Sequence, residues 1–411
     1  MLRPRMLAAL AALAACREPA APTAEPPRIV TLPAPVTCAA ALDEPAALRC
    51  WVELLASPEL AGRDNGSPGG ARARAAIVEA VRAWGLDPAG ETGTFEQPLP
   101  RGANVLARVR GRDPARADEH VVLAAHYDHL GELGGVVYPG ADDNASGVAV
   151  ALAVARRLAA DPPARSVLLA AFDAEEPPDY RRASMGSNHF LAHPTVPRAQ
   201  LVAVVCLDLL GGDLWPGYRS PLYVMGRETF AAAPVPPLPE LPALPVRAMH
   251  LRLVEELPTG RQAFSDHGGF FEEKIPALFL STGRSPHYHQ PSDTPDTIRF
   301  DKLAAAVDVV EAHVRAIADL TGRPAWSEDQ PITPADAAAL AELLAAGLGT
   351  PGAAELAPAR ARLEADLARA RALASAPAPL PEADVAALVA GSLRLQCLLA
   401  PDAEIPPFAC P

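Results

Sequence analysis

Side chains of the types that bind metal ions recur at the ends of apolar runs in this chain. Two imidazoles and three carboxylates make up the set, namely His126, Asp143, Glu176, Asp208 and His289. In open α/β sheets, ligands gather outside the carboxyl ends of the strands, where such residues would meet. Two imidazoles and three carboxylates suit a pair of zinc ions, with one carboxylate bridging them. The set therefore predicts a site for two Zn²⁺ ions per chain.

Three neighbouring carboxylates give this predicted site its chemistry. Asp143 lies in a Gly-rich turn that lets both of its oxygens face outward, so we expect it to be the bridge. Glu175 is adjacent to Glu176, so the two side chains diverge, and Glu175 can take a proton from a metal-activated water and hand it to a leaving amine. Asp128 follows His126 by two residues and can fix the tautomer of that imidazole. The combination predicts a dinuclear zinc hydrolase.

Alternating strands and helices must position these residues. Apolar runs predict strands at residues 104–110, 120–125, 166–172, 201–207 and 277–280. Helices are predicted around them, at 41–56, 68–84, 145–160, 184–193, 265–273 and 300–320. This alternation indicates an α/β fold with a mixed, mostly parallel sheet sandwiched by helices. The proline-rich stretch 213–245 breaks the alternation, and we expect it to be a surface excursion.

The composition changes at about residue 326, where Ala, Leu, Glu and Arg become frequent. Helices are predicted from Thr333-Pro334 onward, at 353–374 and at 381–400. None of them carries a catalytic cluster. Residues 326–411 are therefore predicted to be a helical C-terminal extension of a domain that occupies 41–325.

The first residues read as an export signal. The apolar stretch 6–15 follows two arginines and is too short to span a bilayer. It ends in Leu13-Ala14-Ala15-Cys16, which resembles a bacterial lipobox, so residues 1–15 are predicted to be a lipoprotein signal peptide and Cys16 the lipidated residue. The alternative is an ordinary secretory signal with an incidental cysteine.

A lipidated Cys16 would place the protein outside the cytoplasm, on a membrane. Residues 16–40 are rich in Pro and Ala and are predicted to be a tether. Arg17, rather than Asp, follows the cysteine, which resembles an outer-membrane sorting context in Gram-negative lipoproteins. We therefore expect an anchor in the outer membrane, facing the periplasm or the cell surface.

Cysteine spacing and net charge set further bounds. Local disulfides are the simplest pairing for an exported protein, joining Cys38 to Cys50 and Cys397 to Cys410, with Cys206 a buried thiol in a strand. The formal net charge of −13, from 36 Lys and Arg against 49 Asp and Glu, argues against a nucleic-acid partner. The sequence does not indicate an oligomeric state.

Several short motifs together resemble the dinuclear zinc aminopeptidases of metallopeptidase family twenty-eight. The resemblance covers roughly residues 45–320 and implies the zinc exopeptidase, or phosphorylase/hydrolase-like, fold. Its motifs occur in matching order: Ala125-His126-Tyr127-Asp128-His129-Leu130-Gly131, Gly140-Ala141-Asp142-Asp143-Asn144-Ala145-Ser146-Gly147, Ala174-Glu175-Glu176, Leu207-Asp208, Ser265-Asp266-His267 and Tyr288-His289.

The resemblance implies a role for each matched residue. One zinc would take His126 and Asp208, the other Glu176 and His289, with Asp143 as the bridge. Glu175 would be the general base and Asp128 the residue that orients His126. Tyr288 matches a position whose hydroxyl can stabilise the oxyanion, and the Asp143–Asn144 peptide bond is expected to be cis, as at this turn in relatives. His129, His267 and His287 receive no distinct role.

The same resemblance leaves alternatives open for the reaction. An aminopeptidase acting on a peptide substrate is favoured, whereas a carboxypeptidase or a single-zinc glutaminyl cyclase would share the fold. A non-catalytic binding protein would lack some ligands or the base, and this chain lacks none. Pro177–Ser184 departs from the usual family pattern directly after Glu176. Its Arg181 and Arg182 could bind a substrate carboxylate or simply face water.

Overall fold

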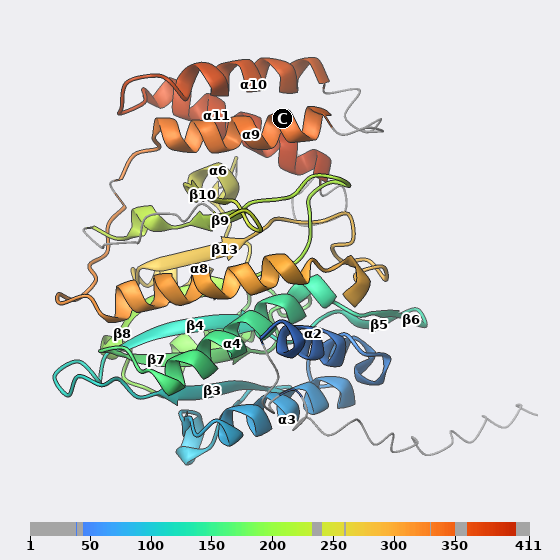
Figure 1. The fold of residues 1–411 in the computed structure, drawn as a ribbon, viewed down its shortest axis with the longest axis vertical. Helices are drawn as coiled ribbons and strands as arrows, with labels where there is room; N and C mark the ends of the chain where they lie inside the picture. Colours follow the sequence, from blue (N-terminus) through green and yellow to red (C-terminus); the bar gives the residue numbers. More distant parts are fainter. Residues whose placement is uncertain are drawn as a thin grey trace, which may run out of the picture. The chain divides into compact units, whose positions relative to one another are not determined.

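The structure is a computed structural model. Its described residues form a mixed sheet of nine strands (Figure 1). The strand order is β1-β3-β7-β4-β8-β13-β9-β10, with β2 paired to β3. The four central strands run parallel, and all of their residues are buried: β7 (Ser166–Phe172), β4 (His120–His126), β8 (Leu201–Leu207) and β13 (Ala277–Ser281). Burial on both faces explains why each strand is a nearly continuous apolar run.

The described residues are 38, 44–231, 241–258, 260–328, 330–349 and 360–399. The predicted signal peptide and the lipidation site Cys16 therefore lie outside them. From residue 38 on, the described residues belong to one compact unit, so the described parts of the predicted domain 41–325 and of the predicted extension fall in the same unit.

The outer strands make the sheet mixed. On one side β1 (Asp87–Pro88), β2 (Glu96–Pro98) and β3 (Ala103–Val109) are antiparallel to their neighbours. On the other side β9 (Leu222–Met225) runs antiparallel to β13 and parallel to β10 (Val246–Met249). The expectation of a surface excursion over 213–245 was wrong for β9, because all four of its residues are buried in the sheet. Flanking prolines mask this short strand in the sequence.

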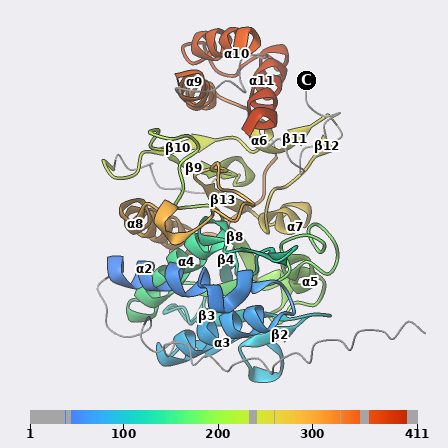
Figure 2. The same ribbon diagram turned by 90° about the vertical axis from the view of Figure 1, so that its right-hand side faces the viewer.

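Helices cover both faces of the sheet (Figure 2). On one face α2 (Glu44–Leu55), α4 (Gly147–Ala160) and α8 (Phe300–Ala318) pack against one another, and α5 (Gly186–Ala192) and α7 (His267–Glu272) lie on the other. The helix α3 (Pro68–Ala83) packs on β3, and Ser67 caps its N-terminus, because the Ser67 Oγ accepts the Gly70 N–H at 3.0 Å.

Short elements connect these parts. Two small hairpins pair β5 (Gly131–Leu133) with β6 (Val136–Tyr138) and β11 (Glu256–Leu257) with β12 (Gly260–Arg261). The remaining turns of helix are η1 (Pro58–Arg63), η2 (Glu91–Gly93), η3 (Ala141–Ser146), η4 (Arg198–Gln200), η5 (Arg227–Thr229), α6 (Arg252–Glu255) and η6 (Pro295–Thr297).

The C-terminal helices continue the core beyond the edge strand β10. The helix α9 (Pro334–Gly349) packs on β10 and on α10 (Arg360–Leu373), and α11 (Glu382–Leu399) packs on α6, as Figure 2 shows. Leu340 and Leu388 belong to the same buried apolar cluster as Met249. The predicted fold class, including a helical C-terminal region, is confirmed. Among the described helices, none is both long and apolar enough to cross a membrane.

One of the two predicted disulfides is confirmed among the described residues. A disulfide joins Cys38 to Cys50, and Cys206 is a buried free thiol in β8. Cys397 is also disulfide-bonded. Its predicted partner, Cys410, lies outside the described residues.

Candidate metal centre

The predicted metal ligands meet beyond the carboxyl ends of the central strands. His126 is the last residue of β4, and Asp208 directly follows β8. Glu176 lies in the loop after β7, Asp143 in η3 before α4, and His289 in the loop after β13. The side chain of His289 is 21% exposed, whereas the other four are buried.

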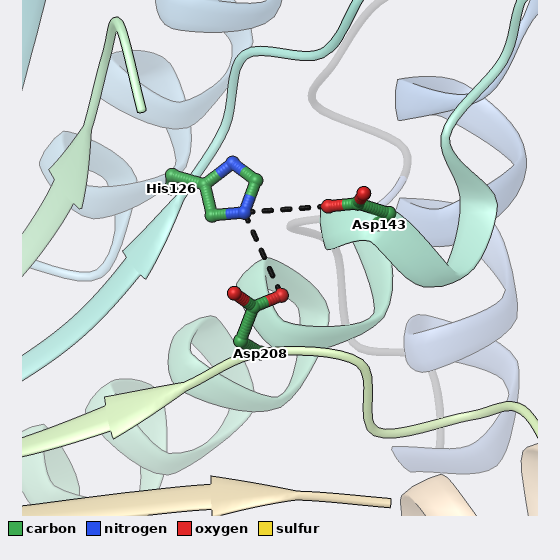
Figure 3. Close-up of side chains that lie close together, drawn as sticks. All are labelled: His126, Asp143 and Asp208. Atoms are coloured by element: carbon green, nitrogen blue, oxygen red, sulfur yellow. Dashed lines mark ion pairs between the residues drawn. The ribbon is translucent and has the colours of Figure 1, made fainter. Parts of the chain in front are cut away.

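One ring nitrogen of His126 faces two carboxylates (Figure 3). Its Nε2 atom is 3.4 Å from Asp143 Oδ1 and 3.6 Å from Asp208 Oδ1. Two ligand atoms bound to one tetrahedral zinc, each at about 2.0–2.1 Å, lie about 3.3 Å apart. The three side chains therefore have the spacing of ligands to a single ion.

Asp143 also faces a second group through its other oxygen. His289 Nε2 is 3.1 Å from Asp143 Oδ2 and 3.1 Å from Glu176 Oε2. One carboxylate thus presents one oxygen to each group, which is the arrangement required of a bridging ligand. The Asp143–Asn144 peptide bond is cis, as expected.

A third imidazole borders the second group, and the sequence had given it no role. His129 Nδ1 is 2.8 Å from Glu176 Oε1 and 3.7 Å from Asp143 Oδ2, and its side chain is fully buried. The ligand atoms of His129, Asp143 and Glu176 all lie within 4.8 Å of one another. Glu176 is therefore held between two imidazoles, His129 and His289. In the sequence, the position of His129 three residues after the predicted ligand His126 could have indicated that it belongs to the site.

The electrostatics of this cluster call for positive charge. Burial opposes a charge on His126, yet Glu175 and Asp208 raise its pKa well above the usual value. Burial would raise the pKa of Asp143, but His129, His126 and His289 hold it well below the usual range. Asp208 Oδ1 and Asp143 Oδ2 are buried and accept no well-aligned hydrogen bond within the described residues. Buried carboxylates without such partners are costly unless a cation neutralises them, so the donor set fits metal ions.

Arg63 holds the backbone of this site from behind. Its guanidinium is fully buried and donates five hydrogen bonds, all to backbone carbonyl oxygens. The acceptors are Tyr127 O at 2.7 Å, Leu55 O at 3.0 Å, Pro139 O at 2.5 Å, Gly140 O at 2.6 Å and Asp143 O at 3.0 Å. Two of these carbonyls belong to Asp143 and to the neighbour of His126. The role of Arg63 could not be predicted from the sequence, because its acceptors are main-chain atoms that leave no sequence pattern.

The turn at Gly140 requires glycine. Its φ is +63°, and a Cβ atom there would lie 2.2 Å from Asp143 O and 2.5 Å from the His129 ring. Asp293 supports the same turn from the other side, since its carboxylate accepts the N–H groups of Asp142 at 2.9 Å and Asp143 at 3.1 Å. Asp143, the predicted bridge, is thus fixed through its backbone on both sides.

Asp128 has a wider role than the one predicted. His126 Nδ1 lies 3.3 Å from the Asp128 backbone oxygen and 3.6 Å from its carboxylate. That carboxylate accepts the backbone N–H groups of Glu175 at 3.1 Å and Glu176 at 3.2 Å. Asp128 therefore positions the Glu175–Glu176 pair as well as the imidazole.

A cavity opens beside the cluster. Asp143, Glu175, Asp208 and Tyr288 all line it. Glu175 Oε2 is 3.9 Å from His126 Nε2, and burial, followed by the nearby carboxylates, raises the pKa of Glu175 well above its usual value. The Tyr288 ring stacks on His289 with 3.9 Å between ring centroids. The predicted base and oxyanion residues therefore face the same space as the metal ligands.

The loop after Glu176 does not line this cavity. Arg181 and Arg182 are exposed, and no residue of Pro177–Ser184 is among the lining residues. The loop is tied down instead by Tyr180 Oη, which donates to Ala263 O at 2.9 Å, and by Ser184 Oγ, which donates to Asp179 at 2.6 Å. Of the two possibilities weighed for these arginines, the structure supports the solvated loop.

Comparison with known proteins places these motifs in a family. Residues 104–314 match the model of peptidase family M28. The uncharacterised Escherichia coli protein YfbL is 31% identical over 211 residues, which cover 46% of this chain and 64% of YfbL. The Bacillus subtilis aminopeptidase YwaD is 28% identical over 204 residues, which cover 47% of this chain and 40% of YwaD. The chain thus spans less than two thirds of the length of either relative.

The fold also matches a solved structure. LapA aminopeptidase from Legionella pneumophila superposes with a TM-score of 0.51 at 19% identity, covering 68% of this chain and 73% of LapA. At this identity the match bears on the fold alone. The family model covers just over half of the chain, from Asn104 before the first ligand to Val314 beyond the last. The chain belongs to peptidase family M28.

Proposed function

We propose that this protein is a zinc-dependent exopeptidase, and specifically an aminopeptidase. The observation that carries the proposal is the buried cluster in which Asp143 faces two groups of ligands while Glu175 lines the adjoining cavity. The choice of aminopeptidase is supported by YwaD, which is named for that activity.

Two Zn²⁺ ions are the proposed cofactors. His126 and Asp208 would hold one ion, Glu176 and His289 the other, and Asp143 both. Bound zinc supplies Lewis acidity, which polarises a carbonyl group and makes a water molecule more acidic. The site would need both ions to offset its buried carboxylates.

The protein's own groups handle the proton and the substrate. The Glu175 carboxylate takes a proton from the attacking water and delivers it to the leaving amine, which requires hydrogen-bond reach to both. The Tyr288 hydroxyl donates a hydrogen bond to the substrate carbonyl oxygen as negative charge develops there. Asp128 keeps Glu175 in place through the Glu175 N–H, so that its side chain remains directed to the cavity.

A substrate panel with metal analysis tests this function. Purified protein should contain two zinc ions per chain, hydrolyse L-aminoacyl amides and leave N-acetylated peptides intact, and a chelator should abolish the activity. Release of residues from the C-terminus of acetylated peptides would replace the proposal by a carboxypeptidase. One zinc ion with pyroglutamate formation would indicate a glutaminyl cyclase. Absence of bound metal and of activity would indicate a binding protein.

We further propose that the protein is a lipoprotein attached to the outer membrane through Cys16. The proposal rests on the lipobox-like Leu13-Ala14-Ala15-Cys16 and on Arg17. Replacing Cys16 with Ala removes the acylation site without touching the catalytic region. The variant should become soluble or remain unprocessed, whereas normal processing with tight membrane association would exclude the lipid anchor.

A further inference from the structure

The cavity at the catalytic centre extends well past the metal ligands. Its empty space, counted out into the open mouth, is about 950 Å³. Catalytic residues form only a small part of its lining. The remaining lining residues come from the strands on the far side of β8, from loops, from α6 and from the C-terminal helices.

Sheet order gives the direction and reach of the cavity. Lining residues come in turn from Asp208 after β8, Phe279 on β13, Met225 on β9 and Met249 on β10. These four strands are successive neighbours in the sheet. Because neighbouring strands lie about 4.7–4.9 Å apart, three steps across the sheet amount to about 14 Å. The cavity therefore leads away from the reacting groups toward the edge strand β10.

Helices of the C-terminal extension line the cavity beyond that edge. Leu343 of α9, together with Ser392 and Gln396 of α11, contributes to the lining. The two helices are held there by packing of α9 on β10 and of α11 on α6, in the arrangement of Figure 2. All three residues lie outside the region that matches family M28, which ends at residue 314.

Apolar side chains dominate this distant end, to which Tyr223 of β9 also contributes. Met225, Met249 and Leu343 line it, and methionine side chains adapt their shape to an apolar guest. The polar groups of α11 satisfy local partners, since Gln396 Nε2 donates to Leu253 O and to Ser392 Oγ, both at 3.3 Å.

The charged group in the lining other than the catalytic carboxylates is Arg284. Its guanidinium lies over the rings of Phe264 at 4.7 Å and Tyr288 at 4.9 Å, next to the catalytic centre rather than at the far end. A charged substrate side chain would therefore reach the α9 and α11 lining without a counter-charge, which disfavours it.

We propose that the C-terminal extension closes the substrate pocket, so that Leu343, Ser392 and Gln396 set how long a side chain the enzyme accepts. The favoured substrates carry a long, unbranched apolar side chain on the residue N-terminal to the cleaved bond. This inference rests on the proposed aminopeptidase function. It adds to that function a substrate class and a specificity role for a segment without catalytic residues.

Side-chain length is the variable that tests the proposal. In the full-length zinc-loaded protein, kcat/KM is measured for the amides of L-alanine, L-norvaline, L-norleucine and L-2-aminooctanoic acid. Each added methylene should raise kcat/KM about fourfold as long as the pocket accommodates it. A flat series, or a maximum at alanine, would overturn the inference while leaving the aminopeptidase function intact.

Two substitutions locate the end of the pocket. Leu343→Trp should fill the end of the pocket. The ratio of kcat/KM for the 2-aminooctanoyl amide to kcat/KM for the norvalyl amide should then fall at least about tenfold, because the alanyl and norvalyl side chains are too short to reach the new ring. Leu367→Trp is the matched control, because Leu367 is a half-buried leucine of α10 that does not line the cavity. Gln396→Glu preserves side-chain size and should lower kcat/KM selectively for the longest substrate. Equal effects on all chain lengths would refute a role for α9 and α11 in selecting substrates.

A binding measurement separates the two levels of the proposal. Calorimetric titration of n-butylamine and n-octylamine into the zinc-loaded protein needs no turnover. Tighter binding of n-octylamine in the wild type, lost in Leu343→Trp and retained in Leu367→Trp, supports the pocket. If this pattern holds but no amide is hydrolysed, the proposed function fails and the pocket remains. If amides are hydrolysed but both amines bind alike, the pocket inference fails.

Discussion

The two halves of the cavity lining differ in the residues that they present. Beyond β7 and β8 lie Glu175 and Asp208, both carboxylates. On β13, β9 and β10 the lining side chains include Phe279, Met225 and Met249. One cavity thus joins a half with reactive carboxylates to an apolar half.

The two halves are also held in place by different interactions. In the first, Arg63 and Asp293 fix the backbone of Asp143 through directional hydrogen bonds, and Asp128 fixes Glu175. In the second half, Phe279, Met225 and Met249 pack within one buried apolar cluster. Hydrogen-bonded networks lose function when one partner is removed, whereas apolar packing tolerates changes that preserve volume. We therefore expect mutations to have large effects in the first half and small ones in the second.

The largest effect is expected at Glu175. Glu175→Gln keeps the shape of the side chain but removes the proton acceptor, so kcat should fall about 10²–10⁴-fold with both metals still bound. Steady-state kinetics and elemental analysis of the same sample measure the two quantities. Glu272→Gln, at an exposed position of α7, serves as the control. A metal-replete Glu175→Gln enzyme with near-normal turnover would exclude Glu175 as the base.

Removing the bridge should weaken both metals together. Asp143→Ala deletes the one side chain that faces both ligand groups, and each dissociation constant should rise by more than about 100-fold, beyond what loss of an outer contact causes. Competition with a chelating dye measures both constants. Asp208→Ala is the informative comparison, since it should weaken one ion only. Two tightly held metals in Asp143→Ala would mean that another group bridges them.

Arg63 tests whether the backbone clamp matters for the metals. Lysine has three donors and no planar fork, so Arg63→Lys cannot restore five hydrogen bonds to carbonyl oxygens. Metal affinity should fall about 10–100-fold, and kcat should recover when the metals are supplied in excess. Arg72→Lys is the control, because Arg72 makes an exposed contact with the Glu59 backbone oxygen. Unchanged metal affinity in Arg63→Lys would show that the loop is rigid without the clamp.

The amino end of β4, away from the metal site, is expected to make folding stability depend on pH. The strand β4 begins with His120, whose pKa is lowered to about 4 by burial and then by Arg108. The unfolded chain, with a histidine pKa of about 6.5, takes up this proton first as the pH falls, so folding stability is lost between about pH 6.5 and pH 4. His120→Gln should remove this contribution, which is on the order of 2 kcal/mol at pH 5.

Denaturant titrations at pH 8 and pH 5 in the presence of a chelator measure that difference without a contribution from metal release. The wild type should lose more stability than His120→Gln. An equal loss in both proteins would assign the acid sensitivity to other groups.

The smallest effect is expected in the apolar half. Met249→Leu preserves side-chain volume and should change kcat/KM for apolar amides by less than about threefold, with metal affinity unchanged. Parallel kinetics and metal titration of Met249→Leu and Arg63→Lys compare the two halves directly. A loss of metal affinity in Met249→Leu would contradict the proposed division of the cavity lining.

Much of this arrangement could be predicted from the sequence. Residues such as His126 and Asp208 end long apolar strands, and local pattern places both the strand and its terminal residue. The central strands and covering helices follow from the same periodicity. Asp143 was recognisable because glycine and paired acidic residues mark its turn.

Other parts depend on contacts that leave little local pattern. The strand β9 is four residues long and lies among prolines, so tertiary pairing with β13 decides its conformation. Arg63 bonds only to main-chain oxygens, which every residue possesses. The C-terminal helices show no catalytic residues, and their place at the cavity arises from the packing of α9 on β10.

The acceptors of Arg63 have a consequence for how this sequence can diverge. All five of its bonds end on carbonyl oxygens, so the arginine constrains where the chain passes but not which side chains it carries. Substitutions at the residues that supply those oxygens leave the bonds available, while substitution of Arg63 removes all five at once. In a mutational scan, position 63 should tolerate far fewer residues than the positions around it, and its intolerance should persist across variants whose neighbouring residues have changed.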